Sequence, residues 1–184
     1  MLPNLLTLSR ILVIPIIMAC FYFDGQSIKY IAATLYVCAC ITDFFDGYLA
    51  RQWHQISDFG KIFDPIADKL LVAIVLLMLS GHGVVYGIHL IPSAVILARE
   101  ILVSGLRSYL AQIQQIIPVT KFSKWKTFTQ MLAISCLLFA YASENTNIFN
   151  LGLYSLWLSS IFTIITGYRY ARKGLLILYP EIFK

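Results

Sequence analysis

Long apolar stretches alternate with short polar segments along the whole chain. A helix that crosses a bilayer needs about 20 mostly apolar residues, because the hydrocarbon core offers no partners to the N–H and C=O groups of other backbone conformations. Six stretches meet this requirement, and each predicts a transmembrane helix: residues 5–23, 30–48, 62–80, 84–106, 125–142 and 148–168. The pattern therefore predicts an all-α integral membrane protein with six transmembrane helices.

The segments between these stretches contain residues that favour turns. Residues 24–27, 81–83 and 143–147 are short and rich in Gly, Ser, Asn and Asp. Residues 108–124 form the longest polar connection. No internal repeat stands out and no linker divides the chain, so we predict one membrane domain that comprises residues 1–184.

The composition supports this interpretation. The chain is 59% hydrophobic and 12% charged, whereas soluble domains have a charged fraction of about 25%. The first apolar stretch has neither a basic segment before it nor a small-residue cleavage site, so it is predicted to be retained as a helix and not removed as a signal peptide. The four cysteines lie in apolar stretches without metal or redox spacing, and we assign them no function.

The basic residues predict the orientation. Six helices place both termini and the connections near residues 51–61 and 107–126 on one side, and every Lys and Arg except Lys29 maps to that side. By the positive-inside rule this side is the cytoplasm. The cations Arg172, Lys173 and Lys184 are interpreted as contacts to lipid head groups, so membrane lipids and no nucleic acid are the predicted partners.

The acidic residues are clustered, since five of the nine lie between residues 41 and 70. Asp43 and Asp46 are three positions apart and Asp64 and Asp68 four apart, which places each pair on one face of its helix. The pairs lie near the cytoplasmic ends of the second and third predicted helices, and an antiparallel hairpin brings them to a similar depth. An aspartate at the centre of a span costs about 2.5–3.5 kcal/mol, and less near its ends. These four carboxylates therefore need a cation.

Two sources of that cation stay open. Arg51, Lys61 and Lys69 are close enough in sequence to form an ion-pair network without metal. However, three cations do not balance four clustered aspartates and Asp58, which we place on the turn between the helices. Oxygen ligands without His or Cys favour a hard divalent ion, Mg²⁺ above all, with Mn²⁺ or Ca²⁺ as alternatives, and four carboxylates can hold two such ions.

The aspartates and the small residues near them resemble a known signature. The pattern is Asp43-x2-Asp46-Gly47-x2-Ala50-Arg51-x8-Gly60-x3-Asp64-x3-Asp68. It is similar to the signature of the CDP-alcohol phosphatidyltransferases at all of its positions. The resemblance implies a CDP-alcohol phosphotransferase-like bundle of six helices and a homodimer. It also implies transfer of a phosphatidyl group from a CDP-linked lipid to an alcohol, with release of CMP.

The resemblance implies roles for individual residues as well. The four signature aspartates would hold two Mg²⁺ or Mn²⁺ ions, and Asp68 would also be the base for the acceptor hydroxyl. The residues expected to form the CMP pocket are Gly47, Ala50, Arg51 and Gly60. Thr7 and Arg10, one turn apart, are candidates for binding the nucleotide or lipid phosphate. For Arg10, extension of the side chain to the lipid head groups is the alternative.

Three further stretches resemble the bacterial members of this family that use CDP-diacylglycerol as donor and sn-glycerol 3-phosphate as acceptor. They are "LPNLLTLSR", "AREILVSGLR" and "KWKTFTQM". A phosphorylated acceptor needs cations of its own, and Arg107, Lys124 and Lys126 lie at a suitable depth. Arg99 is a further candidate, although Arg99 and Glu100 have an equal alternative as an intramembrane pair that fixes helix packing.

Two other kinds of function are compatible with parts of this pattern. The same chemistry could use phosphatidylglycerol, serine or inositol phosphate as the acceptor. A divalent-cation transporter would place acidic residues along the full depth of the membrane or break helices at its midplane. The clustering of the acids near one face favours an enzyme. The resemblance to bacterial proteins implies a bacterial cytoplasmic (inner) membrane, with the active site on the cytoplasmic side.

Overall fold

The computed structural model describes the backbone of residues 2–53, 58–115 and 121–178, and the side chains of residues 8–43, 63, 65–115 and 122–178. Within these ranges the fold is all-α, as predicted, and contains no strand. The helices are α1 (Leu2–Cys20), α2 (Gln26–Trp53), α3 (Asp58–Gly81), α4 (Leu90–Gln112), α5 (Lys121–Ser143) and α6 (Thr146–Leu178), and a short 3-10 helix, η1 (Gly87–His89), precedes α4.

Each predicted span corresponds to one of these α-helices, but several boundaries differ. The fourth was predicted at residues 84–106, whereas α4 begins at Leu90 and ends at Gln112. The predicted polar connection at 108–124 is therefore wrong at both ends, because residues 108–112 belong to α4 and residues 121–124 to α5. Residues 108–112 and 121–124 form helical turns, because α4 and α5 extend beyond their apolar stretches into the polar connection.

The late start of α4 follows from the turn after α3. The N–H groups of Val84 and Val85 both donate to the carbonyl of Leu79, which terminates α3 and keeps these residues out of α4. Gly83 and Gly87 adopt φ values of +69° and +57°. Glycine has no Cβ that opposes such values, so it interrupts the helix at little cost.

Two helical segments are long and apolar enough to cross a membrane in the part of the chain that the structure describes: Gly87–Gln112 and Thr146–Leu178. A third apolar segment, Leu8–Cys20, is shorter. Charged residues lie in the interiors of both kinds of helix, such as Asp43 in α2, Arg99 in α4 and Lys126 in α5. The six-span arrangement as a whole stays a prediction.

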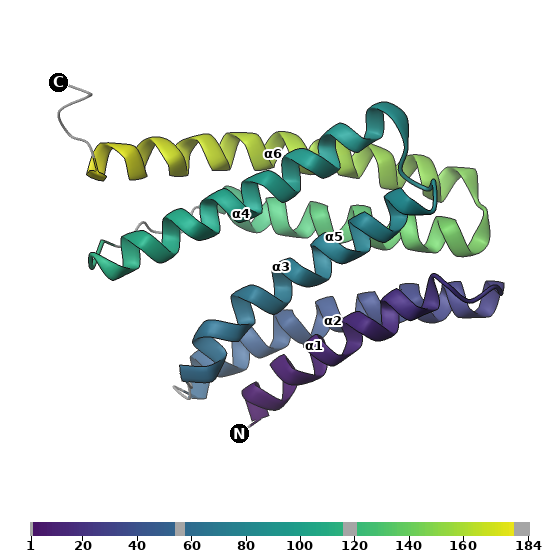
Figure 1. The fold of residues 1–184 in the computed structure, drawn as a ribbon, viewed down its shortest axis with the longest axis horizontal. Helices are drawn as coiled ribbons and strands as arrows, with labels where there is room; N and C mark the ends of the chain where they lie inside the picture. Colours follow the sequence, from purple (N-terminus) through teal and green to yellow (C-terminus); the bar gives the residue numbers. More distant parts are fainter. Residues whose placement is uncertain (1, 54–57, 116–120, 179–184) are drawn as a thin grey trace.

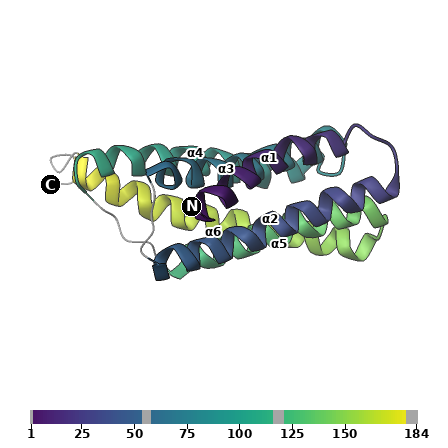
Figure 2. The ribbon, with the colours of Figure 1, turned by 90° about the horizontal axis from the view of Figure 1, so that it is seen from below.

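The helices form two layers. Figure 2 shows α1, α3 and α4 in one layer and α2, α5 and α6 in the other. Both views place the start of α1 and the end of α6 at the same end of the bundle, together with the end of α2, the start of α3, the end of α4 and the start of α5 (Figures 1 and 2). This alternation matches the order that the sequence predicts for the two sides of a membrane.

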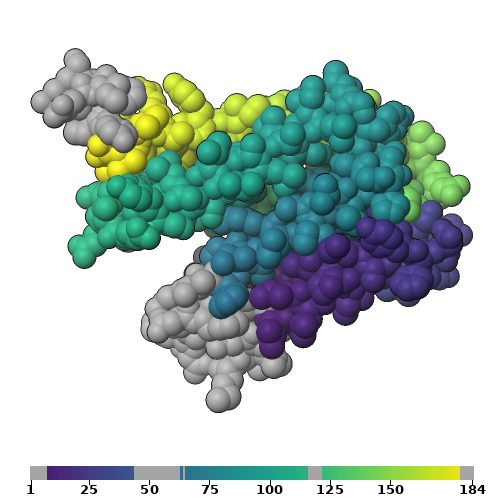
Figure 3. Space-filling model, in the orientation of Figure 1, coloured from purple at the N-terminus to yellow at the C-terminus, as the bar shows by residue number. Residues whose placement is uncertain are grey.

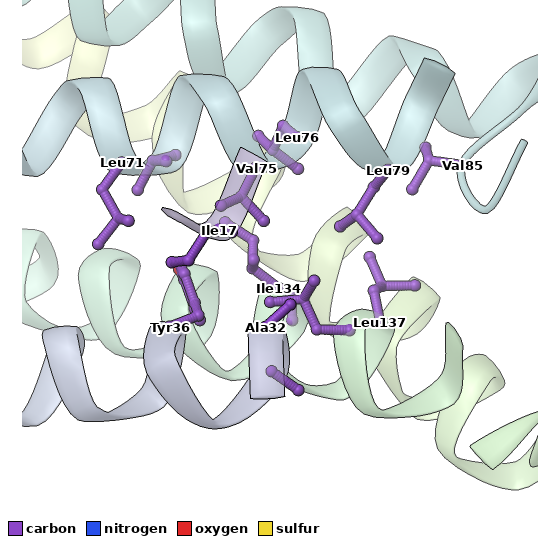
Figure 4. Packing of buried hydrophobic residues seen from close by; sticks show 14 of the residues in the cluster. Ile17, Ala32, Tyr36, Leu71, Val75, Leu76, Leu79, Val85, Ile134 and Leu137 are labelled. Carbon is purple, nitrogen blue, oxygen red and sulfur yellow. The ribbon is translucent and has the colours of Figure 1, made fainter. Parts of the chain in front are cut away.

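The apolar core lies between the layers, toward the opposite end of the bundle. Ile17 of α1, Tyr36 of α2 and Ile134 of α5 are fully buried there (Figure 4). The buried positions of α3 repeat every three or four residues, which is the spacing of one helix face: Leu71, Val72, Val75, Leu76 and Leu79. Because this face of α3 is buried in the apolar core, the side chains available to the polar end of the bundle are those on the other faces of α3.

α3 and α4 lie in the same layer but diverge toward the end that carries the termini (Figure 1). α3 packs mainly against α1, whereas α4 packs mainly against α6. The close approach of α4 to α6 depends on small residues of α6, since a Cβ added at Gly167 would lie 2.9 Å from Cγ of Arg99. The surface between α3 and α4 is hollowed as a result (Figure 3).

Candidate active site

A cavity of about 300 Å³ lies where α3 and α4 diverge. Residues of four helices line it: Asp43 of α2; Pro65, Asp68 and Lys69 of α3; Arg99, Glu100 and Arg107 of α4; and Ser123, Lys126 and Thr127 of α5. The aspartates come from α2 and α3, and most of the basic residues come from α4 and α5. Carboxylates and cations from distant parts of the sequence therefore meet in one polar cavity.

Asp43 and Asp68, two of the predicted metal ligands, both line this cavity. Arg10 of α1 is 3% exposed, and its Nη1 lies 2.7 Å from Oδ1 of Asp43. A buried guanidinium needs such a charged partner, because its desolvation is otherwise uncompensated. Asp68 forms no ion pair within the described part of the chain. Its carboxylate is therefore available to a ligand.

Seven of the predicted site residues have side chains outside the described ones. Asp46, Gly47, Ala50 and Arg51 belong to α2, Gly60 and Asp64 to α3, and Thr7 to α1. Their assignment to the metals and the nucleotide therefore stays a prediction.

The donor set fits a divalent metal. Asp43 and Asp68 bring carboxylate oxygens to one cavity, and oxygen is the ligand that Mg²⁺ and Mn²⁺ prefer. The described side chains alone include no group of three or more His, Cys, Asp or Glu residues suited to a metal. A complete metal site would therefore require Asp46 and Asp64 of the signature as well.

The cavity also holds three of the four predicted acceptor-binding residues. Arg99 donates from Nη2 to Oγ1 of Thr166 on α6, at 3.2 Å. Arg107 lies with its guanidinium carbon 5.5 Å from the ring centroid of Tyr170, a cation–π contact. These contacts to α6 hold both side chains of α4 at the cavity. Lys126 reaches the cavity from α5.

Lys126 is paired with Glu100 across the α4–α5 boundary. Its side chain is 5% exposed and that of Glu100 is 16% exposed, so both charges are largely removed from solvent. Glu100 also lies 3.4 Å from Nη1 of Arg99. Two roles were predicted for Arg99 and Glu100: acceptor binding, or an ion pair that fixes helix packing. The two roles are compatible, because both residues line the cavity while Glu100 also links α4 to α5.

Lys124, the fourth predicted acceptor-binding residue, is exposed and does not line the cavity. The physical reason is the helix period: residues two apart in an α-helix differ by about 200° and face opposite directions. Lys124 and Lys126 therefore cannot serve one site together once α5 begins before them.

Three polar residues line the cavity although the sequence did not suggest them as ligand-binding residues: Lys69, Ser123 and Thr127. Lys69, which the sequence suggested only as a counter-ion of the aspartates, donates to Oγ of Ser104 and so links α3 to α4. Ser123 and Thr127 are four apart on α5 and line the cavity beside Lys126. Their signal in the sequence is the one-turn spacing from Ser123 to Thr127, which becomes visible only when α5 is known to begin at Lys121.

Comparison with known proteins identifies the family of this chain and several relatives. The model of the CDP-alcohol phosphatidyltransferase family matches residues 1–165. A protein of Rickettsia felis is 46% identical over 92% of both chains, one of Cereibacter sphaeroides is 36% identical over 97% of both, and one of Haemophilus influenzae is 35% identical over 95% of both. Each of these relatives is named CDP-diacylglycerol–glycerol-3-phosphate 3-phosphatidyltransferase.

The family match extends well beyond the aspartate signature. It includes the whole of α1 to α5 and most of α6, and therefore every residue that lines the cavity. The family resemblance predicted from the sequence is thereby confirmed: this chain belongs to the CDP-alcohol phosphatidyltransferase family.

Proposed function

We propose that this protein transfers the phosphatidyl group of CDP-diacylglycerol to sn-glycerol 3-phosphate, which yields phosphatidylglycerol phosphate and CMP. The relatives that carry the corresponding name match nearly the whole chain. The observation that carries the proposal is the joint lining of one cavity by Asp43 and Asp68 and by Arg99, Arg107 and Lys126. The first group suits a nucleotide-linked donor with its metal, and the second suits an anionic acceptor.

The basic residues account for the choice of a phosphorylated alcohol. Arg99, Arg107 and Lys126 surround one cavity, and a phosphate monoester carries close to two negative charges at neutral pH. Guanidinium groups can bind such a phosphate through two parallel hydrogen bonds. Serine carries a single carboxylate and no phosphate, so it would use these three cations less fully than a phosphorylated alcohol does.

The four signature aspartates, Asp43, Asp46, Asp64 and Asp68, would hold two Mg²⁺ or Mn²⁺ ions. When bound, such ions supply charge neutralisation at the pyrophosphate and lower the pKa of a nearby hydroxyl. Arg10 would hold Asp43 in place through its ion pair, and the signature resemblance suggests that it also contacts a phosphate of the donor. Thr7, Gly47, Ala50, Arg51 and Gly60 would form the nucleotide pocket, as the signature implies.

Asp68 would act as the base of the reaction. The terminal hydroxyl oxygen of the acceptor attacks the phosphorus atom of the phosphatidyl group, and its proton passes to the Asp68 carboxylate. The bond from that phosphorus to the bridging oxygen breaks, and CMP leaves with the electron pair. Arg99, Arg107 and Lys126 hold the acceptor phosphate during this step, so that its free hydroxyl end lies toward Asp68.

The proposed location is the bacterial cytoplasmic membrane, with six spans and both termini in the cytoplasm. The alternation of helix ends in Figures 1 and 2 is consistent with this topology. The cavity lies at the end of the bundle that carries the termini, so a water-soluble acceptor would enter from the cytoplasm while the acyl chains of the donor stay in the bilayer. A homodimer is proposed from the family alone.

The experiment is an acceptor comparison with purified protein in detergent or vesicles. Labelled CDP-diacylglycerol and Mg²⁺ are incubated with glycerol 3-phosphate, phosphatidylglycerol, serine or inositol phosphate, and CMP and lipid products are quantified. We expect CMP release and phosphatidylglycerol phosphate only with glycerol 3-phosphate. CMP release with another of these alcohols instead would refute the proposed acceptor, and no release with any of them would refute the proposed reaction.

A further inference from the structure

A second, smaller cavity lies beside the main one. Its volume is about 40 Å³, and it shares Asp68, Lys69, Glu100, Lys126 and Thr127 with the main cavity. The residues that line only the smaller cavity are Val72, Gln130 and Met131. A space of this size accommodates a few non-hydrogen atoms, since one water needs about 10–15 Å³ by this measure.

Gln130 is an unusual residue in this lining. Gln130 is 5% exposed, and its Oε1 is buried without a hydrogen-bond partner in the described part of the chain. The other polar side chains nearby on α5 are satisfied by their own helix: Thr127 donates to the carbonyl of Ser123, and Thr129 to that of Trp125. A buried amide oxygen that lacks a partner costs free energy unless a ligand or water supplies the bond.

Gln130 lies near the residues that are proposed to contact the two ends of the acceptor. It lies four residues after Lys126, so the two side chains share one face of α5. Asp68 of α3 lines the same small cavity. An acceptor whose phosphate is held by Lys126 and whose reacting hydroxyl is directed at Asp68 would therefore place its middle carbon near Gln130.

We propose that Gln130 binds the secondary hydroxyl, on carbon 2, of a glycerol phosphate acceptor and thereby determines acceptor specificity. The amide can both accept and donate a hydrogen bond, so it can pair with a hydroxyl in either sense. Together with the phosphate contacts and Asp68 it gives three points of attachment. Three points distinguish the two enantiomers of glycerol phosphate, whereas two points do not.

This inference rests on the proposed function, and its test separates the two. The activity with sn-glycerol 3-phosphate is measured first, and its absence would refute the proposed function alone. The value of kcat/KM is then compared between sn-glycerol 3-phosphate and 3-hydroxypropyl phosphate, which lacks only the hydroxyl on carbon 2. We expect wild type to prefer the natural acceptor by about tenfold or more, the scale of one lost hydrogen bond in a buried polar site.

The decisive variant is Gln130→Met, which keeps the length of the side chain but removes its hydrogen-bonding groups. We expect its preference to fall to about twofold or less, mainly through loss of activity with sn-glycerol 3-phosphate. The matched control is Gln112→Met, at an exposed position of α4 that does not line either cavity, and it should retain the wild-type preference. An unchanged preference in Gln130→Met, or the absence of any preference in wild type, would overturn the inference.

Discussion

Lys126 of α5 forms its ion pair with Glu100 of α4 and not with Asp68 of α3, although all three residues line the same cavity. The consequence is a division of the charges in the proposed site. Glu100 holds the ammonium group at the α4–α5 boundary, and the carboxylate of Asp68 stays available for the acceptor hydroxyl. Glu100 is thus a positioning residue for Lys126.

Replacement of Glu100 by Gln removes this counter-ion while preserving side-chain volume. Lys126 is then free to pair with Asp68, so we expect the KM for glycerol 3-phosphate to rise about tenfold, the scale of one charge-assisted hydrogen bond. The KM for CDP-diacylglycerol should stay within about twofold of wild type. Steady-state kinetics with each substrate varied in turn provide the measurement.

Glu144→Gln is the matched control for this change, because Glu144 is exposed at the turn between α5 and α6 and far from the cavity in sequence and in the fold. It should behave as wild type. An equal rise in both KM values for Glu100→Gln would instead indicate a general structural role.

The opposite directions of Lys124 and Lys126 give a second prediction. Lys126→Gln should lower kcat/KM for glycerol 3-phosphate about 100-fold, because it removes a buried charge contact to phosphate. Lys124→Gln should change it less than about threefold, because its side chain is exposed and outside the cavity. Comparable losses in the two variants would contradict the orientation of α5.

The contact between Gly167 and Arg99 gives a third. A Cβ at residue 167 would lie 2.9 Å from Cγ of Arg99. Since Cγ is close to the backbone, the arginine cannot move away without displacing α4 from α6. Gly167→Ala should therefore lower both thermal stability and kcat/KM for glycerol 3-phosphate.

Gly105→Ala is the control for that variant. No atom lies within 4 Å of a Cβ added at Gly105 of α4, and replacement of Gly by Ala in a helix interior contributes about 0.5–1 kcal/mol. Thermal unfolding in detergent should show equal or higher stability for Gly105→Ala and lower stability for Gly167→Ala. A stable, fully active Gly167→Ala protein would argue against the observed packing of Arg99.

Metal removal tests the predicted use of Mg²⁺ or Mn²⁺. The four carboxylates proposed to share one site would repel one another without a cation, so treatment with EDTA should abolish CMP release, and added Mg²⁺ or Mn²⁺ should restore it. Metal binding should also raise the thermal unfolding temperature of wild type, and less so for Asp43→Asn. Full turnover after complete chelation would contradict a metal-dependent site.

Much of this arrangement could be predicted from the sequence, for physical reasons that differ between residues. The apolar stretches identify the helices, because helices that are buried in lipid or in the core must be apolar. The spacing of the aspartates indicates that the two members of each pair lie on one helix face. The turn at Val84 and Val85 could not be predicted, because its hydrogen bonds to Leu79 compete with an equally apolar continuation of the helix.

The partner of each charge was harder still to predict. Arg99 is adjacent to Glu100 in sequence, yet Glu100 also pairs with Lys126 from another helix. Lys124 and Lys126 look equivalent until the start of α5 determines which of them turns inward. Contacts between helices depend on their mutual rotation, and no local pattern in the sequence determines that rotation.

Phosphatidyl transfer is proposed to depend on Asp68 together with the basic residues of one cavity. The most direct test measures formation of phosphatidylglycerol phosphate and CMP from CDP-diacylglycerol and glycerol 3-phosphate by purified wild type and by Asp68→Asn, with matched thermal unfolding curves. We expect equimolar products from wild type, and a folded Asp68→Asn protein that retains almost no turnover. Wild-type turnover in a folded Asp68→Asn protein would contradict the proposed dependence on Asp68.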